Sequence, residues 1–424
     1  MIKNTRRRFN KIAAMAAASA TLPAVPVFAQ DKPIRIGFAM SVSGGLAAAG
    51  KSALVASKLW RDKVNASGGL LGRQVELVTY DDQSNPALVP AIYTKLLDID
   101  KADLILSGYA TNQIAPVMPI AVQRRKLLLA LHGLGNNEEI GYDRYFHVVP
   151  YGPDPKKDWL TDFYGLIASI KPMPKTVGFV VADAEFAQNS IGSVRALSKS
   201  NGLRVVYDQS YPMSTVDMSA MVRGLKAADP EVVFVFTYPQ HSTAFIRSVS
   251  EIGLGPNAKL VGGGMVGMQF ANALEALGPS LNGFVTFHFY VPEPSLERPT
   301  TSAFLKTYQA EAVKEGTDPL GYYIPTFAYA RLEVLQKAIE VTRSLDDGKL
   351  ADYIRSTPVE TVVGKVAFGP KGERLERGAI FVQYRGIVAA GGLDQFKRPG
   401  TQVIVSPQNV ASGPLVVPFS AARQ

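Results

Sequence analysis

The stretch Pro150-Tyr151-Gly152-Pro153-Asp154-Pro155 divides the sequence into two segments that share one pattern. Its three prolines exclude a helix or a central strand, because proline lacks the amide proton that both structures use. On each side of it, short apolar runs rich in β-branched residues alternate with longer segments of helical period. Near-continuous apolar strands separated by helices indicate a parallel sheet covered on both faces. The sequence therefore predicts an α/β protein with two doubly wound units.

The expected elements alternate along both segments. Before the proline-rich stretch we expect strands at 34–40, 75–80, 104–107 and 127–131, and helices from about 50 to 64 and at 86–97 and 115–123. After it we expect helices at 158–169, 190–200, 218–227 and 241–251, with strands at 176–181, 204–211, 232–237 and 259–262. After residues 283–291, helices at 300–314, 325–342 and 350–356 and hairpin strands within 362–392, around a turn at 369–372, complete the pattern. Ligands of open α/β sheets bind beyond the carboxyl ends of the strands, so two such units facing one another predict a ligand cleft.

The first 29 residues are expected to be an export signal. Five cationic residues and no acidic one precede a modestly apolar run at 12–22, and small residues occupy the −3 and −1 positions of a cleavage site at 27–29. Thr5-Arg6-Arg7-Arg8-Phe9-Asn10-Lys11 resembles the twin-arginine export consensus, and an ordinary Sec signal with a basic start is the alternative. Either signal predicts a periplasmic protein.

Composition argues against several classes of function. Of the 45 Lys and Arg residues, five lie in the first 29, which leaves 40 against 36 acidic residues. The densest basic run of the remainder, Arg124-Arg125-Lys126, is explained by a solvated helix end, so we expect no nucleic-acid partner. The absence of cysteine excludes disulfides, thiolate metal sites and a catalytic thiol.

Two glycine motifs require an interpretation. Residues 45–52 satisfy the P-loop expression G-x-x-x-x-G-K-[ST] between an expected strand and an expected helix. However, no apolar strand ending in a Walker-B aspartate follows, and an exported chain meets no ATP, so we expect no nucleotide cofactor. Residues 262–267 fit G-x-G-x-x-G without the acidic residue that a dinucleotide site needs about 20 positions later, which favours a glycine loop close to another ligand.

No catalytic constellation is evident. The four histidines, His132, His147, His241 and His288, are too dispersed for a local metal motif, and neither G-x-S-x-G nor H-E-x-x-H occurs. We therefore expect neither a metal nor an enzymatic activity, although an exported enzyme stays open as an alternative.

Six short motifs occur in the order found in one family. They are Ile34-Arg35-Ile36-Gly37 with Ser43-Gly44, Val64-Asn65-Ala66-Ser67-Gly68-Gly69-Leu70-Leu71-Gly72-Arg73, Tyr80-Asp81-Asp82-Gln83-Ser84-Asn85-Pro86, Pro119-Ile120-Ala121, Ile252-Gly253-Leu254 and Gly364-Lys365-Val366-Ala367-Phe368. This series resembles type I periplasmic solute-binding proteins of the leucine/isoleucine/valine-binding class, from about residue 31 to 390. The resemblance implies two Rossmann-like lobes joined by three crossovers, near 149–153, 284–291 and 360–366.

The resemblance also implies a domain organisation and a role. Lobe 1 would comprise residues 31–150 and 285–362, lobe 2 residues 151–284 and 363–392, and residues 393–424 would form a tail wrapped on the surface. The implied role is capture of a small solute, as a monomer, for an ABC permease in the inner membrane. A ligand-sensing module for a regulator or receptor would have the same sequence features.

The resemblance assigns the ligand's carboxylate to two loops of lobe 1. The first contains Tyr109, Ala110 and Thr111, where Ala110 replaces a residue that usually carries a hydroxyl. The second, at 130–136, contains His132 and Gly133; His132 is either an anion partner or simply a polar residue near a helix.

The matching positions of lobe 2 depart further from the family. Phe186 stands where the family has tyrosine, after Asp183, whereas Tyr238 matches a lining tyrosine. The acidic residue that pairs with an amino acid's ammonium group would fall at Gly264 or Met265, neither of which is acidic.

A buried ammonium group without a carboxylate partner is costly. Either Asp183 or Glu185 therefore replaces the missing acid, or the ligand has no amino group. With Tyr109, Phe186 and Tyr238 as possible ring-stacking walls, an aromatic or aliphatic carboxylate becomes a candidate ligand beside an amino acid.

Overall fold

A five-stranded parallel sheet organises the first lobe. The computed structural model describes residues 32–424, so the expected export signal lies outside the described residues. In spatial order the strands are β2 (Val75–Tyr80), β1 (Ile34–Ala39), β3 (Leu104–Tyr109), β4 (Leu128–Leu131) and β5 (Tyr145–His147). Strands β1, β3 and β4 are almost wholly buried, as expected for apolar runs covered on both faces.

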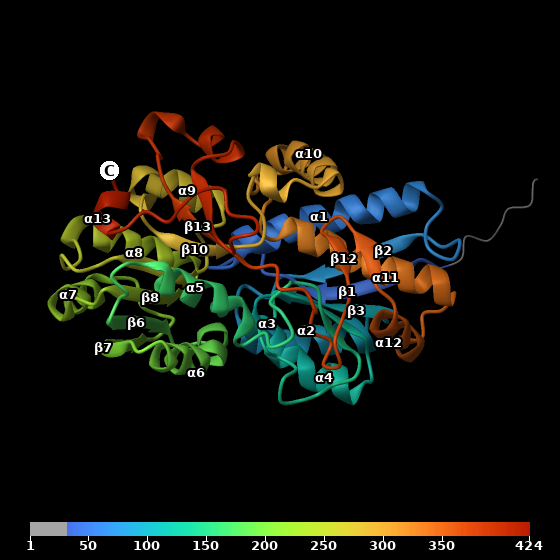
Figure 1. Ribbon diagram of the computed structural model, residues 1–424. Helices are drawn as coiled ribbons and strands as arrows, with labels where there is room; N and C mark the ends of the chain where they lie inside the picture. Colours follow the sequence, from blue (N-terminus) through green and yellow to red (C-terminus); the bar gives the residue numbers. More distant parts are fainter. Residues whose placement is uncertain (1–31) are drawn as a thin grey trace, which may run out of the picture. The chain divides into compact units, whose positions relative to one another are not determined.

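Helices cover both faces of this sheet (Figure 1). One row contains α1 (Ala47–Ala66), α10 (Pro299–Lys314), α11 (Pro325–Thr342) and α12 (Asp347–Ser356). The other contains η1 (Pro86–Leu88), α2 (Val89–Asp98), α3 (Thr111–Ile114), η2 (Ala115–Val117) and α4 (Met118–Gln123). Helices α10 to α12 follow lobe 2 in the sequence, so the chain returns to lobe 1 to complete it.

A seven-stranded mixed sheet organises the second lobe. Its spatial order is β14 (Gln402–Ser406), β13 (Ile380–Tyr384), β10 (Val285–His288), β9 (Leu260–Met265), β8 (Val232–Thr237), β6 (Thr176–Ala182) and β7 (Arg204–Tyr211). The five strands from β10 to β7 are parallel, and β13 and β14 are antiparallel to their neighbours. One helix row contains α5 (Asp158–Ser169) and α6 (Glu185–Ser200), and the other α7 (Ser219–Ala228), α8 (Pro239–Ile252) and α9 (Ala271–Leu277).

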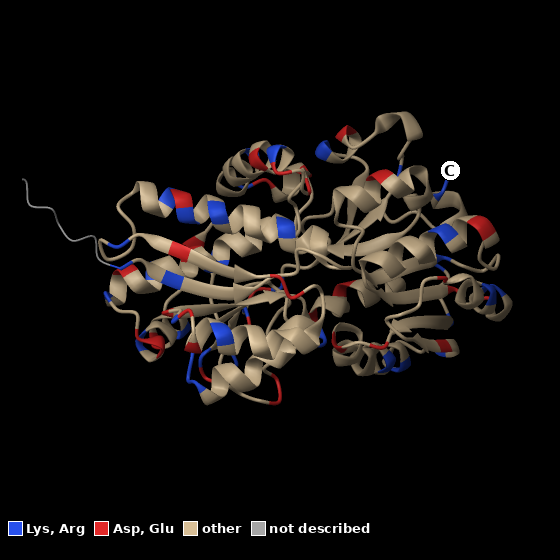
Figure 2. Cartoon of the chain, turned by 180° about the vertical axis from the view of Figure 1, so that it is seen from behind, with Lys and Arg blue, Asp and Glu red and all other residues tan. Residues whose placement is uncertain are grey.

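The predicted α/β class with two doubly wound lobes is confirmed. Short elements complete the chain: η3 (Gly278–Leu281), η4 (Pro294–Leu296), β11 (Val359–Thr361), β12 (Gly364–Val366), η5 (Ala389–Gly391), η6 (Asp394–Lys397) and α13 (Phe419–Ala422). In the described residues, no helix is long and apolar enough to cross a membrane. Basic and acidic residues are interspersed over the helices and loops of the face in Figure 2.

The structure differs from the expected organisation at three places. Strand β10, expected to open the return to lobe 1 at residue 285, lies in the sheet of lobe 2. Strand β12 pairs with β11 beside α11, so the third crossover to lobe 2 follows residue 366. The hairpin expected within 362–392 is reduced to one antiparallel bridge, between Phe368 and Arg374, around the turn at 369–372. The tail expected on the surface contributes β14, whose five residues are all buried, because β13 leaves an antiparallel edge that β14 occupies.

Candidate ligand-binding site

Two loops of lobe 1 meet beyond adjacent parallel strands. Ala110 follows β3 and His132 follows β4, which pair with each other, so both residues lie at the same edge of the sheet. Both have positive φ, 83° for Ala110 and 58° for His132, in a region that non-glycine residues rarely adopt. Such backbone costs of order 1–3 kcal/mol per residue and concentrates at ligand sites. Seven other non-glycine residues of the described chain also have positive φ, so this backbone conformation occurs in both predicted loops without being specific to them.

Hydrogen bonds fix the two loops to each other. The Leu134 amide donates to Oγ1 of Thr111 at 3.1 Å, and the Asn136 side chain donates to the Thr111 carbonyl at 3.0 Å. The Gly133 amide donates to Nε2 of His147 at 2.9 Å. Because Oγ1 of Thr111 already accepts one hydrogen bond, its own proton is available to an acceptor in the cleft.

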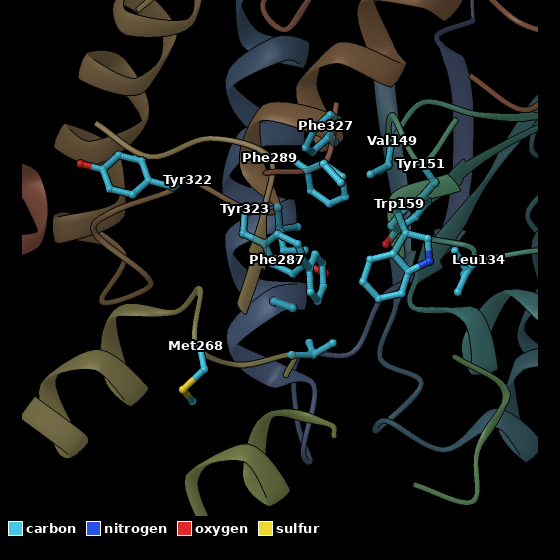
Figure 3. Close-up of a cluster of buried hydrophobic side chains, with 14 of the residues drawn as sticks. Leu134, Val149, Tyr151, Trp159, Met268, Phe287, Phe289, Tyr322, Tyr323 and Phe327 are labelled. Carbon is cyan, nitrogen blue, oxygen red and sulfur yellow. The ribbon is translucent and has the colours of Figure 1, made fainter. Parts of the chain in front are cut away.

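Buried rings from both lobes form one continuous group, which we call the aromatic cluster (Figure 3). Each member lies within ring-contact distance of another member, and the members are Tyr109, His132, Tyr151, Trp159, Phe186, Phe236, Tyr238, Phe287, Phe289, Tyr323 and Phe327. Tyr151 and Phe289 lie on the first and second crossovers, so the cluster joins the lobes where they are hinged.

The cluster brings together four predicted site residues in two pairs. Tyr109 and His132 contact each other at 5.7 Å between centroids, and Phe186 and Tyr238 at 6.2 Å. Trp159 contacts Phe186 at 5.9 Å and links the second pair to the crossover residues.

His132 is a buried polar member of the cluster. Five rings surround it, and its Nδ1 lies 3.5 Å from the hydroxyl of Tyr151. Burial, and then the charge of His147, lowers the pKa of His132 well below its usual value, so the ring is neutral at pH 7. When Nδ1 accepts the Tyr151 proton, the proton of the neutral ring is on Nε2, which makes Nε2 a donor.

Three buried polar atoms of the cluster lack a hydrogen-bond partner among the described residues. They are Nε2 of His132, Nε1 of Trp159 and the hydroxyl of Tyr238. The His132 ring approaches the backbone of Tyr323, and the Tyr238 hydroxyl approaches the backbone amide of Phe186. All three can donate a proton, and a buried donor left unpaired costs about 1–3 kcal/mol. The cluster is therefore suited to a ligand that carries hydrogen-bond acceptors.

A buried guanidinium group lies beneath the lobe 1 loops. Nη1 of Arg331, on α11, donates to the Ser107 carbonyl at 2.7 Å, whereas Nε and Nη2 have no partner. Burial lowers the pKa of Arg331 to about 10, so it stays charged at pH 7. None of the ion pairs in residues 32–424 includes it. Its charge also disfavours protonation of His132, which shows that its field reaches the cluster.

The remaining predicted residues of lobe 2 lie apart from this group of donors. Asp183 and Glu185 are exposed, and the nearest partner of the Asp183 carboxylate is Nε2 of Gln188 at 3.5 Å. Gly264 is part of β9, where a Cβ atom would lie 2.5 Å from the Phe236 ring, so this glycine accommodates an aromatic side chain. Met265 is fully buried.

The lobes are in contact across the cleft. Nδ2 of Asn189, on α6, donates to the Leu134 carbonyl at 2.7 Å, and the Ala271 amide of α9 donates to Oδ1 of Asp318 at 3.3 Å. A groove of about 260 Å³ runs between the start of α1 and the helices α8 and α9, and Gly45 and Gln240 face each other in it.

The P-loop-like residues are used for helix packing. Gly50 lies directly against the backbone of Ser41, and the hydroxyl of Ser52 donates to the Ala49 carbonyl within α1. Lys51 is exposed. The serine hydroxyl that a nucleotide site would direct to magnesium is therefore occupied. In the described part of the chain, no group of three His, Asp or Glu side chains is placed to hold a metal.

Several residues of the site carry no recognisable motif in the sequence. Tyr151 lies in the proline-rich stretch, which predicts only a boundary. Trp159 and Arg331 come from helices, Phe289 from a crossover and Tyr323 from the turn before α11, all without a local motif. The aromatic residues next to each crossover were the one available signal.

Known proteins with similar sequences and structures bind small solutes. An amino acid binding protein of Pseudomonas aeruginosa is 25% identical over 333 residues, which cover 76% of this chain and 84% of that protein. The solute-binding protein of an ABC transporter from Rhodopseudomonas palustris, in complex with 3,4-dihydroxybenzoic acid, superposes with a TM-score of 0.70 at 18% identity, covering 84% and 94% of the two chains. The branched-chain amino acid binding protein of Streptococcus pneumoniae, in complex with isoleucine, gives 0.69 at 20% identity, with 83% and 96% covered. The family model described as periplasmic binding protein matches residues 33–392, and the chain belongs to this family.

Proposed function

We propose that this protein captures a small aromatic carboxylate in the aromatic cluster between its lobes and delivers it to an ABC permease. The observation that carries the proposal is the set of three unpartnered donors, on His132, Trp159 and Tyr238, in a cluster otherwise made of rings. A carboxylate and a ring hydroxyl supply the acceptors that these donors need, and the ring itself stacks on aromatic walls.

The electrostatics favour an anion in the same place. Arg331 is charged, buried and outside every ion pair of the described residues, so its field is not cancelled by a neighbouring carboxylate. His132 is neutral and donates without adding charge. A carboxylate near His132 would be stabilised by both groups.

An amino acid fits the site less well, because its ammonium group needs a buried carboxylate. Asp183 and Glu185, the two candidates for that role, are exposed. Asp318 is buried where the lobes touch, but its oxygens accept the amides of Ala271, Leu320 and Gly321. This supports a ligand without an amino group, similar in class to the dihydroxybenzoic acid bound by the relative from Rhodopseudomonas palustris.

We propose that the protein captures its solute for transport and does not catalyse a reaction on it. We propose that the protein works in the periplasm as a monomer and releases its ligand to a permease in the inner membrane. The cleft supports reversible capture because few direct contacts, such as that from Asn189 to Leu134, hold the lobes together on its open side.

Ligand-dependent unfolding tests the proposal. Benzoate, 4-hydroxybenzoate and 3,4-dihydroxybenzoate are compared with leucine, isoleucine and valine in thermal melts, followed by calorimetric titration. A ligand at 100 times its Kd adds about 2.7 kcal/mol to the free energy of unfolding. We expect a clear rise in Tm with at least one aromatic acid. If only the aliphatic amino acids stabilise the protein, the proposed ligand class is refuted. The expected ligand is then an amino acid, as in the relatives.

A further inference from the structure

A second cavity lies where the three crossovers meet. Its volume is about 160 Å³, and we call it the hinge cavity. Pro150 lines it from the first crossover, Phe289 and Tyr290 from the second, and Arg374 and Gly378 from the third. Every segment that connects the lobes thus contributes to its wall.

The charged groups of the hinge cavity are mostly cationic. Arg298, Arg374 and Arg377 line it together with one acid, Glu376. Glu376 pairs with Arg374, and Nη2 of Arg377 pairs with Oδ2 of Asp162 at 3.5 Å, outside the lining. The lining therefore carries two more positive charges than negative ones.

Arg374 is the buried centre of this group. Its side chain is 2% exposed, and its nitrogens donate to the carbonyls of Val148 at 3.1 Å and Lys365 at 3.3 Å, whereas Nε has no partner. Burial lowers the pKa of Arg374, although the charge of Glu376 and its hydrogen bond oppose this shift. The guanidinium groups of Arg374 and Arg298 both line the hinge cavity. Glu376 offsets one of these two positive charges, so the unpaired Nε–H of Arg374 and the guanidinium group of Arg298 are the groups left for an anion.

The opposite wall is apolar. Phe289, Phe327 and Ile380 are buried and line the cavity. We infer that the hinge cavity binds a small organic carboxylate, with its oxygens toward Arg374 and Arg298 and its short apolar body against Phe289 and Phe327. Inorganic phosphate has the charge but not the apolar surface, so it should bind more weakly.

The hinge cavity and the cleft share two rings. Phe289 and Phe327 also contact His132, at 5.9 and 5.5 Å between centroids. An anion in the hinge cavity would hold these rings and all three crossovers in one arrangement. Binding of the anion would then change the affinity of the cleft for its solute. Binding of the solute would change the affinity of the hinge cavity for the anion by the same factor.

Crystals soaked with 3-bromopropionate test the location, because the bromine has an anomalous signal. We expect a peak in the hinge cavity, and in solution a saturable calorimetric titration with propionate that is at least about tenfold tighter than with inorganic phosphate. Arg298→Gln removes one exposed cation of the lining, and Arg223→Gln, an exposed arginine on α7, is the matched control.

The variants separate this site from the cleft. Arg298→Gln should weaken propionate binding about tenfold, while Arg223→Gln and the cleft variant His132→Phe leave it within about twofold. A bromine peak without a solution titration, or a titration lost in His132→Phe and kept in Arg298→Gln, would overturn the inference. The inference does not depend on the solute proposed for the cleft, because His132→Phe separates the two sites.

Discussion

Replacement of Asp318 by asparagine should stabilise the protein at neutral and alkaline pH. Asp318 lies between α10 and α11, and its carboxylate accepts the amides of Ala271, Leu320 and Gly321 at 3.2–3.4 Å. Burial raises the pKa of Asp318 from 3.8 to about 6, in spite of these hydrogen bonds. The folded protein therefore holds this proton more tightly than the unfolded chain does.

The magnitude follows from the difference between the two pKa values. Two units at about 1.4 kcal/mol each mean that ionised Asp318 costs the folded state about 3 kcal/mol at pH 8. As the pH falls through 6 the folded protein takes up the proton, and at pH 5 the cost is about half as large. Asparagine cannot ionise, but its Nδ2 would face the Gly321 amide, at a cost of about 1 kcal/mol. The net gain should be about 2 kcal/mol at pH 8 and about 0.5 kcal/mol at pH 5.

Urea unfolding of the wild type and Asp318→Asn at both pH values measures this difference. Asp352→Asn, which replaces an exposed aspartate of α12, is the control and should change the free energy of unfolding by less than about 0.5 kcal/mol. If Asp318→Asn destabilises the protein at pH 8, or if its effect is equal at pH 5 and pH 8, the carboxylate is not held at an energetic cost and the reasoning fails.

Three further outcomes are expected. His132→Phe keeps a ring but removes the donor, so calorimetry should show a loss of about 1.5–3 kcal/mol in affinity for the aromatic acid; unchanged affinity would exclude His132 from the contacts. Ala110→Gly should raise the free energy of unfolding in urea by about 1 kcal/mol, because glycine adopts the positive φ of Ala110 freely, and a destabilised variant would contradict the strain. Lys51→Ala should leave Tm unchanged, because Lys51 is exposed on α1. Mg-ATP should change the Tm of neither the wild type nor this variant, because the Ser52 hydroxyl is hydrogen-bonded within the helix. Stabilisation by Mg-ATP would restore the nucleotide interpretation.

Most of the fold could be predicted because buried parallel strands carry a local signal. The apolar runs of β6 and β8 are bounded by polar segments and lie within one residue of the expected positions. Strand β14 was not predicted, since its core Val403-Ile404-Val405 is short and is flanked by glycine, serine and proline. It is a strand because β13 offers it an edge, and that edge is a tertiary feature.

The candidate site divides in the same way. The loops containing Ala110 and His132 follow strands and could be located from motif order. Trp159 and Tyr323 belong to the site because they contact rings more than 100 residues away, on Phe287 and His132 respectively, and no local sequence pattern indicates such contacts. Asp183 shows the opposite failure: it occupies the expected position after β6, but its side chain points to solvent.

The return of α10 to α12 to lobe 1 has a consequence for how the chain folds. All five strands of the first sheet are complete by residue 147, but α11, which covers one of its faces, begins only at residue 325. During synthesis, one apolar face of the sheet therefore lacks this helix until almost 180 further residues have been made. The contacts between α1 and α11 are of very high sequence separation, which is typical of slow folding and of intermediates that aggregate. A nascent chain of this architecture is one that a chaperone would be expected to hold until α11 emerges.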